Sequence, residues 1–383
     1  MTHETINSRV IIVGAGAVLK EKFTPPVLDR LGPISKRVIL DLEAVRLQDK
    51  GTLLRGGGIL ADGTRVPFNL KNISFEERKN IIAVVTTPDH LGVINSLIES
   101  GVQRFIVEKP LVNNRGEITQ LQAMLNQHPE LKVYPLDFYV QKITPLLILT
   151  GKIKSDDPRF DWVTTTNDQP VNQELVGGIN NLIGDLEGIE VTIFEGGSLG
   201  IPDLDKRKWP ENDNLRGGML LDLGTHALAP LIAAGLIPAF GVRVEYANRY
   251  ILGEDRLSWI RAKSEQVEIN ADAQLSIEKD ARKIACLVKV GKTFHDGGMW
   301  KLIIRGSKGD IFMGLRTGQR LTVEPKEGES FQLKLKINDP YAYAFEEAQM
   351  YFDGYTEFDG NLQAMLSSIE IIEDIKVASN QII

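Results

Sequence analysis

The stretch Arg9-Val-Ile-Ile-Val-Gly-Ala-Gly-Ala17 decides the fold of the first part of this 383-residue chain. Its β-branched run predicts a short buried strand, and the glycines that follow predict a tight turn into a helix. Such a turn lets the backbone approach a pyrophosphate and points a helix N-terminus toward it. A plain strand-to-helix connection explains the turn equally well. The residues expected to bind a dinucleotide here are Gly14, Gly16, Ala17 and Val18.

Further apolar runs of the same kind occupy residues 37–41, 80–85 and 104–108. Residues 90–101 have apolar side chains at helical spacing and end at a glycine, which completes a strand-helix-strand unit. Near-continuous apolar strands suit a parallel sheet that is covered on both faces. We therefore expect residues 1–135 to form an α/β domain built on a parallel sheet.

Polar residues follow these strands at what is predicted to be one edge of the sheet. Asp41 ends the second strand, where a carboxylate binds the ribose hydroxyls of NAD and repels the 2′-phosphate of NADP. Helix capping is the alternative for Asp41, and Arg46, one turn further on, favours NADP. Ligands of open parallel sheets bind at this edge. Further candidates for cofactor binding are therefore Thr86, Thr87, Pro88, His90, Glu108 and Lys109. For His90, the alternative is a solvated histidine at the start of a helix.

The second half of the chain has a different pattern, in which apolar and polar residues alternate. This alternation is typical of strands with one wet face, in an antiparallel or mixed sheet under one helical layer. Residues 361–380 return to helical periodicity. We expect residues 136–383 to form an α+β domain with a large open, predominantly antiparallel sheet, whose open face is either a dimer surface or solvated. The predicted strands are residues 190–194, 242–246, 274–277, 283–290, 300–304 and 331–335.

The segment Gly217-Gly-Met-Leu-Leu-Asp-Leu-Gly-Thr-His226 carries the clearest chemistry. On a helix, Asp222 and His226 are neighbours on one face, so the carboxylate can orient or charge-stabilise the imidazole. Apolar neighbours predict a partly dry setting, which suits a general acid/base pair. An ion pair on a helix surface is the alternative.

In order and spacing these motifs resemble the glucose-fructose oxidoreductase/inositol dehydrogenase/rhizopine catabolism (Gfo/Idh/MocA) family over essentially the whole chain. Residues 139–145 resemble the family's crossover segment, and residues 304–311 resemble its late hairpin. The resemblance implies a Rossmann domain that binds NAD(H) or NADP(H). It also implies a second domain whose open sheet mediates homodimers or homotetramers.

The resemblance implies hydride transfer to or from a secondary alcohol or ketone of a sugar, cyclitol or related polyhydroxylated molecule. Lys109 would lie beside the nicotinamide and the substrate oxygen, Asp222 would bind substrate or orient its neighbour, and His226 would be the general acid/base. The expected substrate-binding residues are Tyr139, Lys142, Trp209, Asp222 and His226, although Trp209 belongs to a basic loop that a solvated surface also explains.

Three departures from the family pattern concern cofactor packing and the crossover segment. Phe23 and Thr24 stand before Pro25-Pro26, where a histidine is frequent. Leu19 replaces the small third residue of the glycine-rich turn, and Lys142 stands where arginine is more usual. Two other functions remain open. One is a non-catalytic NAD(P)-binding regulator, since relatives include a co-repressor, and the other is a redox-neutral NAD-assisted glycosidase or epimerase.

Composition disfavours several other classes of protein. The net charge of −7 gives no global attraction for nucleic acid or for an anionic membrane. Five histidines and one cysteine are too few for a Cys/His zinc site, and we expect no metal. Cys286 is expected to be a small buried hydrophobe in a reducing compartment. No apolar segment has the length of a signal peptide or a membrane span, so a cytoplasmic location is expected.

Overall fold

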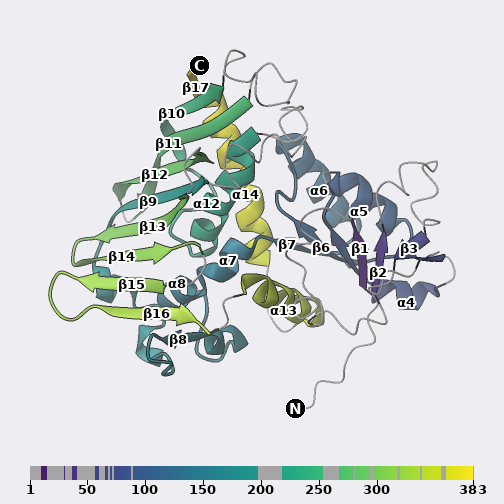
Figure 1. The fold of residues 1–383 in the computed structure, drawn as a ribbon, viewed down its shortest axis with the longest axis horizontal. Coiled ribbons are helices and arrows are strands. Elements are labelled where there is room, and N and C mark those ends of the chain that lie inside the picture. Colours follow the sequence, from purple (N-terminus) through teal and green to yellow (C-terminus); the bar gives the residue numbers. More distant parts are fainter. Residues whose placement is uncertain are drawn as a thin grey trace. The chain divides into compact units, whose positions relative to one another are not determined.

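The structure is a computed structural model. It describes residues 10–14, 30, 37–40, 57–59, 65–67, 70, 73–87, 89–196, 218–252, 267–279, 281–293, 297–316, 320–336, 339–354 and 359–382. The chain divides into two compact units, each composed of several segments (Figure 1). The first unit comprises Met1–Val112, Gly116–Phe138 and Asp339–Leu362. The second comprises Asn113–Arg115, Tyr139–Asn338 and Gln363–Ile383.

The first unit is built on a sheet with the strand order β4-β3-β2-β1-β5-β6-β7. The five strands β1, β2, β5, β6 and β7 run parallel, and β3 and β4 extend the sheet in antiparallel pairing. The predicted parallel sheet is confirmed. The strands are β1 (Val10–Val13), β2 (Arg37–Leu40), β3 (Gly57–Ile59), β4 (Arg65–Pro67), β5 (Ile82–Val85), β6 (Arg104–Glu108) and β7 (Lys132–Leu136).

Short helices connect the parallel strands, as their sequences require. Helix α4 (Phe75–Lys79) begins with a capping box, in which the side chains of Ser74 and Glu77 satisfy each other's backbone amides. Helix α5 (His90–Ile98) is capped by Asp89, whose carboxylate accepts from the amide of Gly92 at 3.0 Å. Helix α6 (Arg115–Gln127) leads into β7. The α5 and α6 connections are the strand-helix-strand units expected of a parallel sheet.

Helix α13 (Pro340–Asp353) belongs to the first unit although it comes late in the sequence. Phe345 is fully buried in the same core cluster as the β1 residues Val10 and Ile12. The ammonium of Lys132 donates to the carbonyls of Tyr351 and Phe352 at 3.2 and 2.9 Å. These carbonyls lie in the last turn of the helix, where backbone carbonyls have no partner within the helix itself. From the sequence this segment is expected in the second domain, whereas its apolar face is buried against the first sheet.

The second unit is built on a sheet with the order β17-β10-β11-β12-β9-β13-β14-β15-β16-β8. Its pairs are antiparallel except for β9 with β12 and β10 with β17, so the expected predominantly antiparallel sheet is confirmed. The strands are β8 (Val163–Thr165), β9 (Leu186–Glu195), β10 (Arg243–Leu252), β11 (Val267–Lys279), β12 (Arg282–Lys292), β13 (Met299–Gly306), β14 (Gly309–Gly314), β15 (Arg320–Pro325), β16 (Phe331–Leu335) and β17 (Asn380–Ile382).

One face of this sheet is covered by helix α12 (Gly218–Ala233), which packs against β9, β11 and β12 (Figure 1). Alternate residues of β12 are buried on that side, including Cys286, which is fully buried as predicted. Burial raises the pKa of its thiol to about 12. The remaining helices of this unit are α7 (Phe138–Lys142), α8 (Thr144–Leu149), α9 (Ile179–Ile183) and α14 (Asp359–Ala378), with 3₁₀ turns η4 (Pro158–Trp162) and η5 (Gln173–Leu175).

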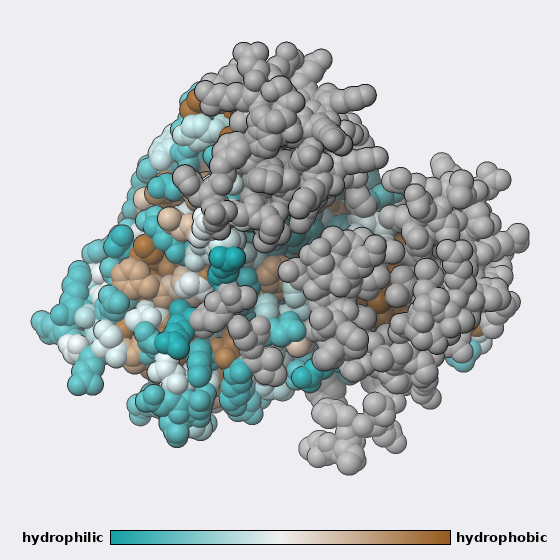
Figure 2. Space-filling model, in the orientation of Figure 1, coloured by the Kyte–Doolittle hydropathy of each residue, from teal (hydrophilic) through white to brown (hydrophobic). Residues whose placement is uncertain are grey.

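The other residues of these strands are more exposed and largely polar. In Figure 2, hydrophobic residues occur in small groups among hydrophilic ones over the part of the surface that belongs to the strands of the second unit. Within the described residues, no helix has the length and apolar character needed to cross a membrane. The α/β fold class expected from the sequence, with one parallel and one mostly antiparallel sheet, is therefore what the structure shows.

Candidate functional site

The carboxyl ends of β1, β5 and β6 lie side by side, because β5 pairs in parallel with both of the other strands. Gly14 follows β1, Thr86 and Thr87 follow β5, and Lys109 follows β6. The structure therefore brings together at one edge three motifs that are far apart in the sequence. This is the edge at which ligands of open parallel sheets bind.

Gly14 is the closest-packed point of this edge. Its φ of 114° lies in the left-handed region, and a Cβ atom there would lie 2.4 Å from Oγ1 of Thr86 and 3.2 Å from Cγ2 of Thr87. The Thr86 hydroxyl donates to the carbonyl of Val13 at 3.1 Å. Only glycine fits this position. The strand consequently ends in a buried glycine against which Thr86 and Thr87 pack.

His90 is buried at the start of α5, so the alternative of a solvated histidine is excluded. Its Nδ1 lies 3.2 Å from the carbonyl oxygen of Leu111, to which a ring protonated at Nδ1 donates. Burial lowers the pKa of the imidazole to about 4, against smaller raising effects from the Leu111 and Pro110 backbone. At neutral pH, an uncharged His90 therefore joins α5 to the turn that follows Lys109.

Lys109 lies directly after β6 and is half-buried, as is Glu108 at the end of the strand. The Lys109 amide donates to the carbonyl of Leu136 on β7 at 3.3 Å, and the peptide bond to Pro110 is cis. Asp137 follows β7 at the same edge and is 2% exposed. This buried carboxylate is not predicted from the sequence, because a single aspartate after a strand has no distinctive spacing.

In the second unit, α12 carries Asp222 and His226, which are 4% and 5% exposed. They lie one turn apart on the same side of the helix. The helix is buried along almost its whole length, and it packs against β9, β11 and β12. The alternative of an ion pair on a helix surface is therefore excluded, and both side chains occupy the dry setting that makes acid/base groups tunable.

Tyr139 of α7 lies against the imidazole of His226. The ring centroids are 4.2 Å apart at an interplanar angle of 27°, which is a stacked arrangement. The ammonium of Lys142 lies 4.0 Å from the centroid of the Tyr139 ring and donates to the carbonyl of Leu315 at 2.6 Å. Lys142, Tyr139 and His226 thus form one column of side chains, in which Lys142 is buried and bonded to the backbone.

Several candidates lie outside the described residues, namely Gly16, Ala17, Val18, Asp41, Pro88 and Trp209. Within the described residues, no group of three or more His, Cys, Asp and Glu side chains could hold a metal ion. No sequence pattern indicates that His90 bonds to Leu111 or that Tyr139 stacks on His226. Both contacts join elements that no local pattern relates.

Comparison with solved structures identifies proteins of the same fold. The 3-ketoreductase KijD10 from Actinomadura kijaniata, in complex with TDP-benzene and NADP, has a TM-score of 0.62 at 15% identity, covering 98% of each chain. An oxidoreductase from Thermotoga maritima has a TM-score of 0.61 at 16% identity, covering 97% of this chain and 96% of that one. A structure from Erwinia carotovora atroseptica that is assigned as an oxidoreductase has a TM-score of 0.63 at 14% identity, covering 98% and 100%.

At these identities the likeness shows the fold, and it extends over nearly the entire length of each chain. No protein-family model matches the sequence. A search of curated proteins also finds no match.

Proposed function

We propose that this chain is an NAD(P)-dependent oxidoreductase of the Gfo/Idh/MocA family. It transfers hydride between the nicotinamide and a secondary alcohol or ketone of a sugar, cyclitol or related polyhydroxylated molecule. The observation that carries the proposal is the meeting of Gly14, Thr86 and Lys109 at one carboxyl edge of a parallel sheet. The buried Asp222 and His226 supply the acid/base chemistry that such a reaction requires.

The residues at this edge fit a dinucleotide. A pyrophosphate needs backbone that it can approach closely, and Gly14 adds no side chain of its own where β1 ends. The hydroxyl of Thr86 and the methyl group of Thr87 flank that backbone. In this proposal Gly14, Gly16, Ala17, Val18 and Asp41 also hold the cofactor, together with Pro88, His90 and Glu108.

When bound, the dinucleotide supplies or accepts the hydride at its nicotinamide ring. The ammonium of Lys109 stabilises the negative charge that develops on the substrate oxygen as its carbon is oxidised. His226 accepts the hydroxyl proton in that direction and returns it in the other. Asp222, one turn earlier on α12, favours the charged imidazole that forms. Stacking on Tyr139 fixes the plane in which the imidazole can receive the proton.

The neighbours of the same fold support the class of substrate and cofactor. KijD10 is a 3-ketoreductase whose structure contains NADP and TDP-benzene. A ketoreductase on this fold agrees with a carbonyl or alcohol as the reacting group. The column formed by Lys142, Tyr139 and His226 contributes the other proposed substrate contacts, together with Trp209 and Asp222.

Titration of the purified protein with NADH and with NADPH, followed by nicotinamide fluorescence, tests the proposal. We expect saturable binding that Gly14→Val abolishes, because the new side chain collides with Thr86. Gly314→Ala is the matched control, since a Cβ atom there meets nothing within 4 Å. Absence of binding to the wild-type chain, or unchanged binding by Gly14→Val, would contradict the proposal.

The preference for NAD rests on Asp41. We expect NADH to bind more tightly than NADPH, and Asp41→Ala to reduce that difference. Once a substrate has been found among sugars and cyclitols, Lys109→Met and His226→Asn are expected to lower kcat by roughly 100-fold or more. Full turnover by both variants would exclude the roles given to these residues.

We also propose that the outer face of the second sheet joins copies of the chain as a homodimer or homotetramer. Tyr246 and Met299 on this face are 42% and 50% exposed, and both residue types are enriched in protein–protein interfaces. Light scattering coupled to size-exclusion chromatography should give at least twice the 42.6 kDa of one chain, and Tyr246→Glu should reduce the mass. A monomeric wild-type protein would exclude this assembly.

A further inference from the structure

Glu268 is a buried carboxylate that lies outside every motif described above. It is 5% exposed and belongs to β11, yet it faces the side of the sheet covered by α12. A β-bulge explains this direction, because Tyr250 pairs with Asn270 while the next residue, Ile251, pairs with Glu268. The extra residue in β11 reverses the alternation of side chains, so Glu268 points to the covered face.

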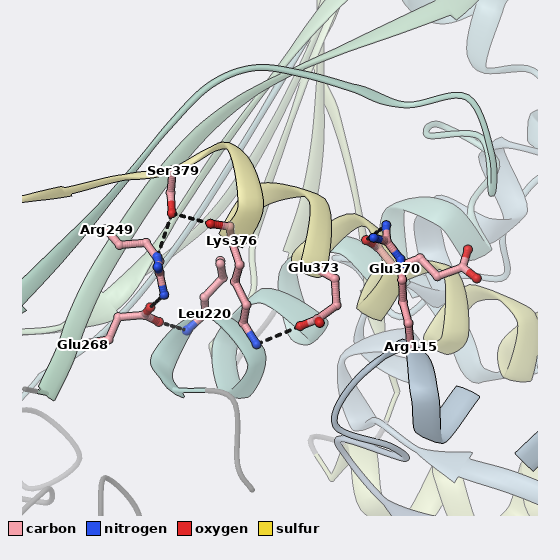
Figure 3. A network of polar contacts seen from close by, with 8 residues as sticks. All are labelled: Arg115, Leu220, Arg249, Glu268, Glu370, Glu373, Lys376 and Ser379. Atoms are coloured by element: carbon pink, nitrogen blue, oxygen red, sulfur yellow. Dashed lines mark hydrogen bonds and ion pairs between the residues drawn. The ribbon is translucent and has the colours of Figure 1, made fainter. Parts of the chain in front are cut away.

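The carboxylate of Glu268 holds the N-terminal end of α12 (Figure 3). Its Oε1 accepts a hydrogen bond from the backbone amide of Leu220 at 2.6 Å. The first turn of α12 contains no acidic residue of its own, although a helix N-terminus has unsatisfied amides and a positive dipole end. The negative charge at this end of the helix is therefore supplied by a strand 48 residues further along the chain.

Arg249 binds the second carboxylate oxygen of Glu268. Its Nη1 donates to Oε2 of Glu268 at 3.3 Å, and its Nε donates to the hydroxyl of Ser379 at 2.7 Å. Ser379 in turn donates to the carbonyl of Lys376 at the end of α14 at 2.9 Å. Both oxygens of the buried carboxylate are thus bonded, as a buried charge requires. The start of α12 is thereby tied to β10, β11 and α14 (Figure 3).

Leu220 precedes Asp222 by two residues and His226 by six on the same helix. A helix rises about 1.5 Å per residue and moves nearly as a rigid body, so a shift at Leu220 is transmitted to both side chains. His226 stacks on Tyr139 with ring centroids 4.2 Å apart, so a displacement of α12 would change this contact. We propose that Glu268, held by Arg249, is a positioning residue for Asp222 and His226. Its effect on turnover rests on the function proposed above, whereas its effect on geometry does not.

Nuclear magnetic resonance of the histidine ring protons tests the geometry without cofactor or substrate. The chain has five histidines, and His226→Asn assigns the resonance of interest. Stacking on Tyr139 displaces that resonance through the ring current. Glu268→Ala removes the acceptor, and Glu268→Asp withdraws it from Leu220 by about 1.5 Å, the length of one carbon–carbon bond. We expect the His226 resonance to move toward that of an unstacked imidazole, further for Glu268→Ala than for Glu268→Asp.

Glu373→Asp is the matched control. It shortens another carboxylate of the same group of contacts, which bonds to Lys376 at 2.9 Å and not to Leu220 (Figure 3). The control should leave the His226 resonance unchanged. If Glu268→Ala does not fold, Glu268→Asp, which keeps the charge, decides the question. A His226 resonance that stays at the wild-type position in the folded Glu268 variants would overturn the proposal, as would an equal movement in the control.

Turnover provides the second measurement once a substrate is known. Misplacement of a reacting group by about 1 Å can cost on the order of 100-fold in rate. For Glu268→Asp we expect kcat to fall by roughly 10- to 100-fold, with the dissociation constant of NADH unchanged and with Glu373→Asp at the wild-type rate. An unchanged kcat would overturn the positioning role. If the wild-type chain binds no dinucleotide, the proposed function fails, but the resonance measurement still decides the role of Glu268.

Discussion

His90 provides a test of the first unit that needs neither cofactor nor substrate. The imidazole is buried, its Nδ1 lies 3.2 Å from the Leu111 carbonyl, and burial lowers its pKa from 6.5 to about 4. Because the folded pKa lies below the unfolded one, the unfolded chain binds the proton more readily. The stabilising contribution is therefore fully present above pH 6.5 and is lost as the pH falls toward 4.

The size of this effect follows from the two pKa values. Between pH 7.5 and pH 5, wild-type protein should lose about 2 kcal/mol of unfolding free energy through His90 alone, and the total approaches about 3 kcal/mol below pH 4. His90→Asn removes the titrating group and keeps an amide N–H near the position of Nδ1, from which it can donate to Leu111. The difference in stability between wild type and variant should thus shrink or reverse in acid.

Urea denaturation followed by far-ultraviolet circular dichroism, repeated between pH 7.5 and pH 5, measures this difference. Other titrating groups are common to both proteins and cancel in the comparison. A difference that stays constant within about 0.5 kcal/mol over this range would refute the reasoning, since the predicted change is several times larger. A native His90 resonance that titrates near pH 6.5 would refute it independently.

Three further outcomes are expected from burial and hydrogen bonding. Cys286, fully buried with its pKa raised to about 12, should not react with a thiol reagent until urea unfolds the chain, and reaction of the native protein would contradict its placement. Phe345→Ala should cost about 3–5 kcal/mol of unfolding free energy. Phe75→Ala, at a ring that is 54% exposed, should cost about 1 kcal/mol or less. Equal losses for the two variants would contradict the assignment of α13 to the first core. Lys142→Met removes the donor to the Leu315 carbonyl and should cost about 1–3 kcal/mol in the same assay, so an unchanged stability would show that this hydrogen bond does not support the fold.

The pattern of residue types predicted β1, β2, β5 and β6 of the first sheet and β9, β10, β11, β12, β13 and β16 of the second, whereas β3, β4, β7, β8, β15 and β17 were not predicted. Continuous apolar runs such as Val10–Val13 form parallel strands buried on both faces, and alternating runs such as residues 283–290 form strands with one covered face. These patterns are local, because the polarity of each side chain in a strand depends on whether its face of that strand is buried or exposed. The spacing of Asp222 and His226 on one helix could be predicted for the same reason.

Helix α13 shows where local pattern is insufficient. Its sequence is compatible with a helix in either unit, and its position in the second half of the chain led to the expectation that it belongs to the second. Its place is set by Phe345 and its neighbours, which fill the core beside Val10 and Ile12. Contacts between residues more than 300 positions apart depend on the path of the whole chain, which no short stretch encodes.

The candidate site also combines features that the sequence determines with features that depend on the tertiary structure. The sequence determined which chemical groups are available, namely a glycine turn, a lysine after a strand, and an acid/base pair one helical turn apart. Only the tertiary structure decided which of them meet and in what surroundings: Gly14 packs against Thr86, His90 is buried neutral against Leu111, and His226 stacks on Tyr139. The physical reason is that periodicity and spacing report the faces of single elements, whereas burial, pKa and hydrogen-bond partners depend on elements that distant parts of the chain bring together.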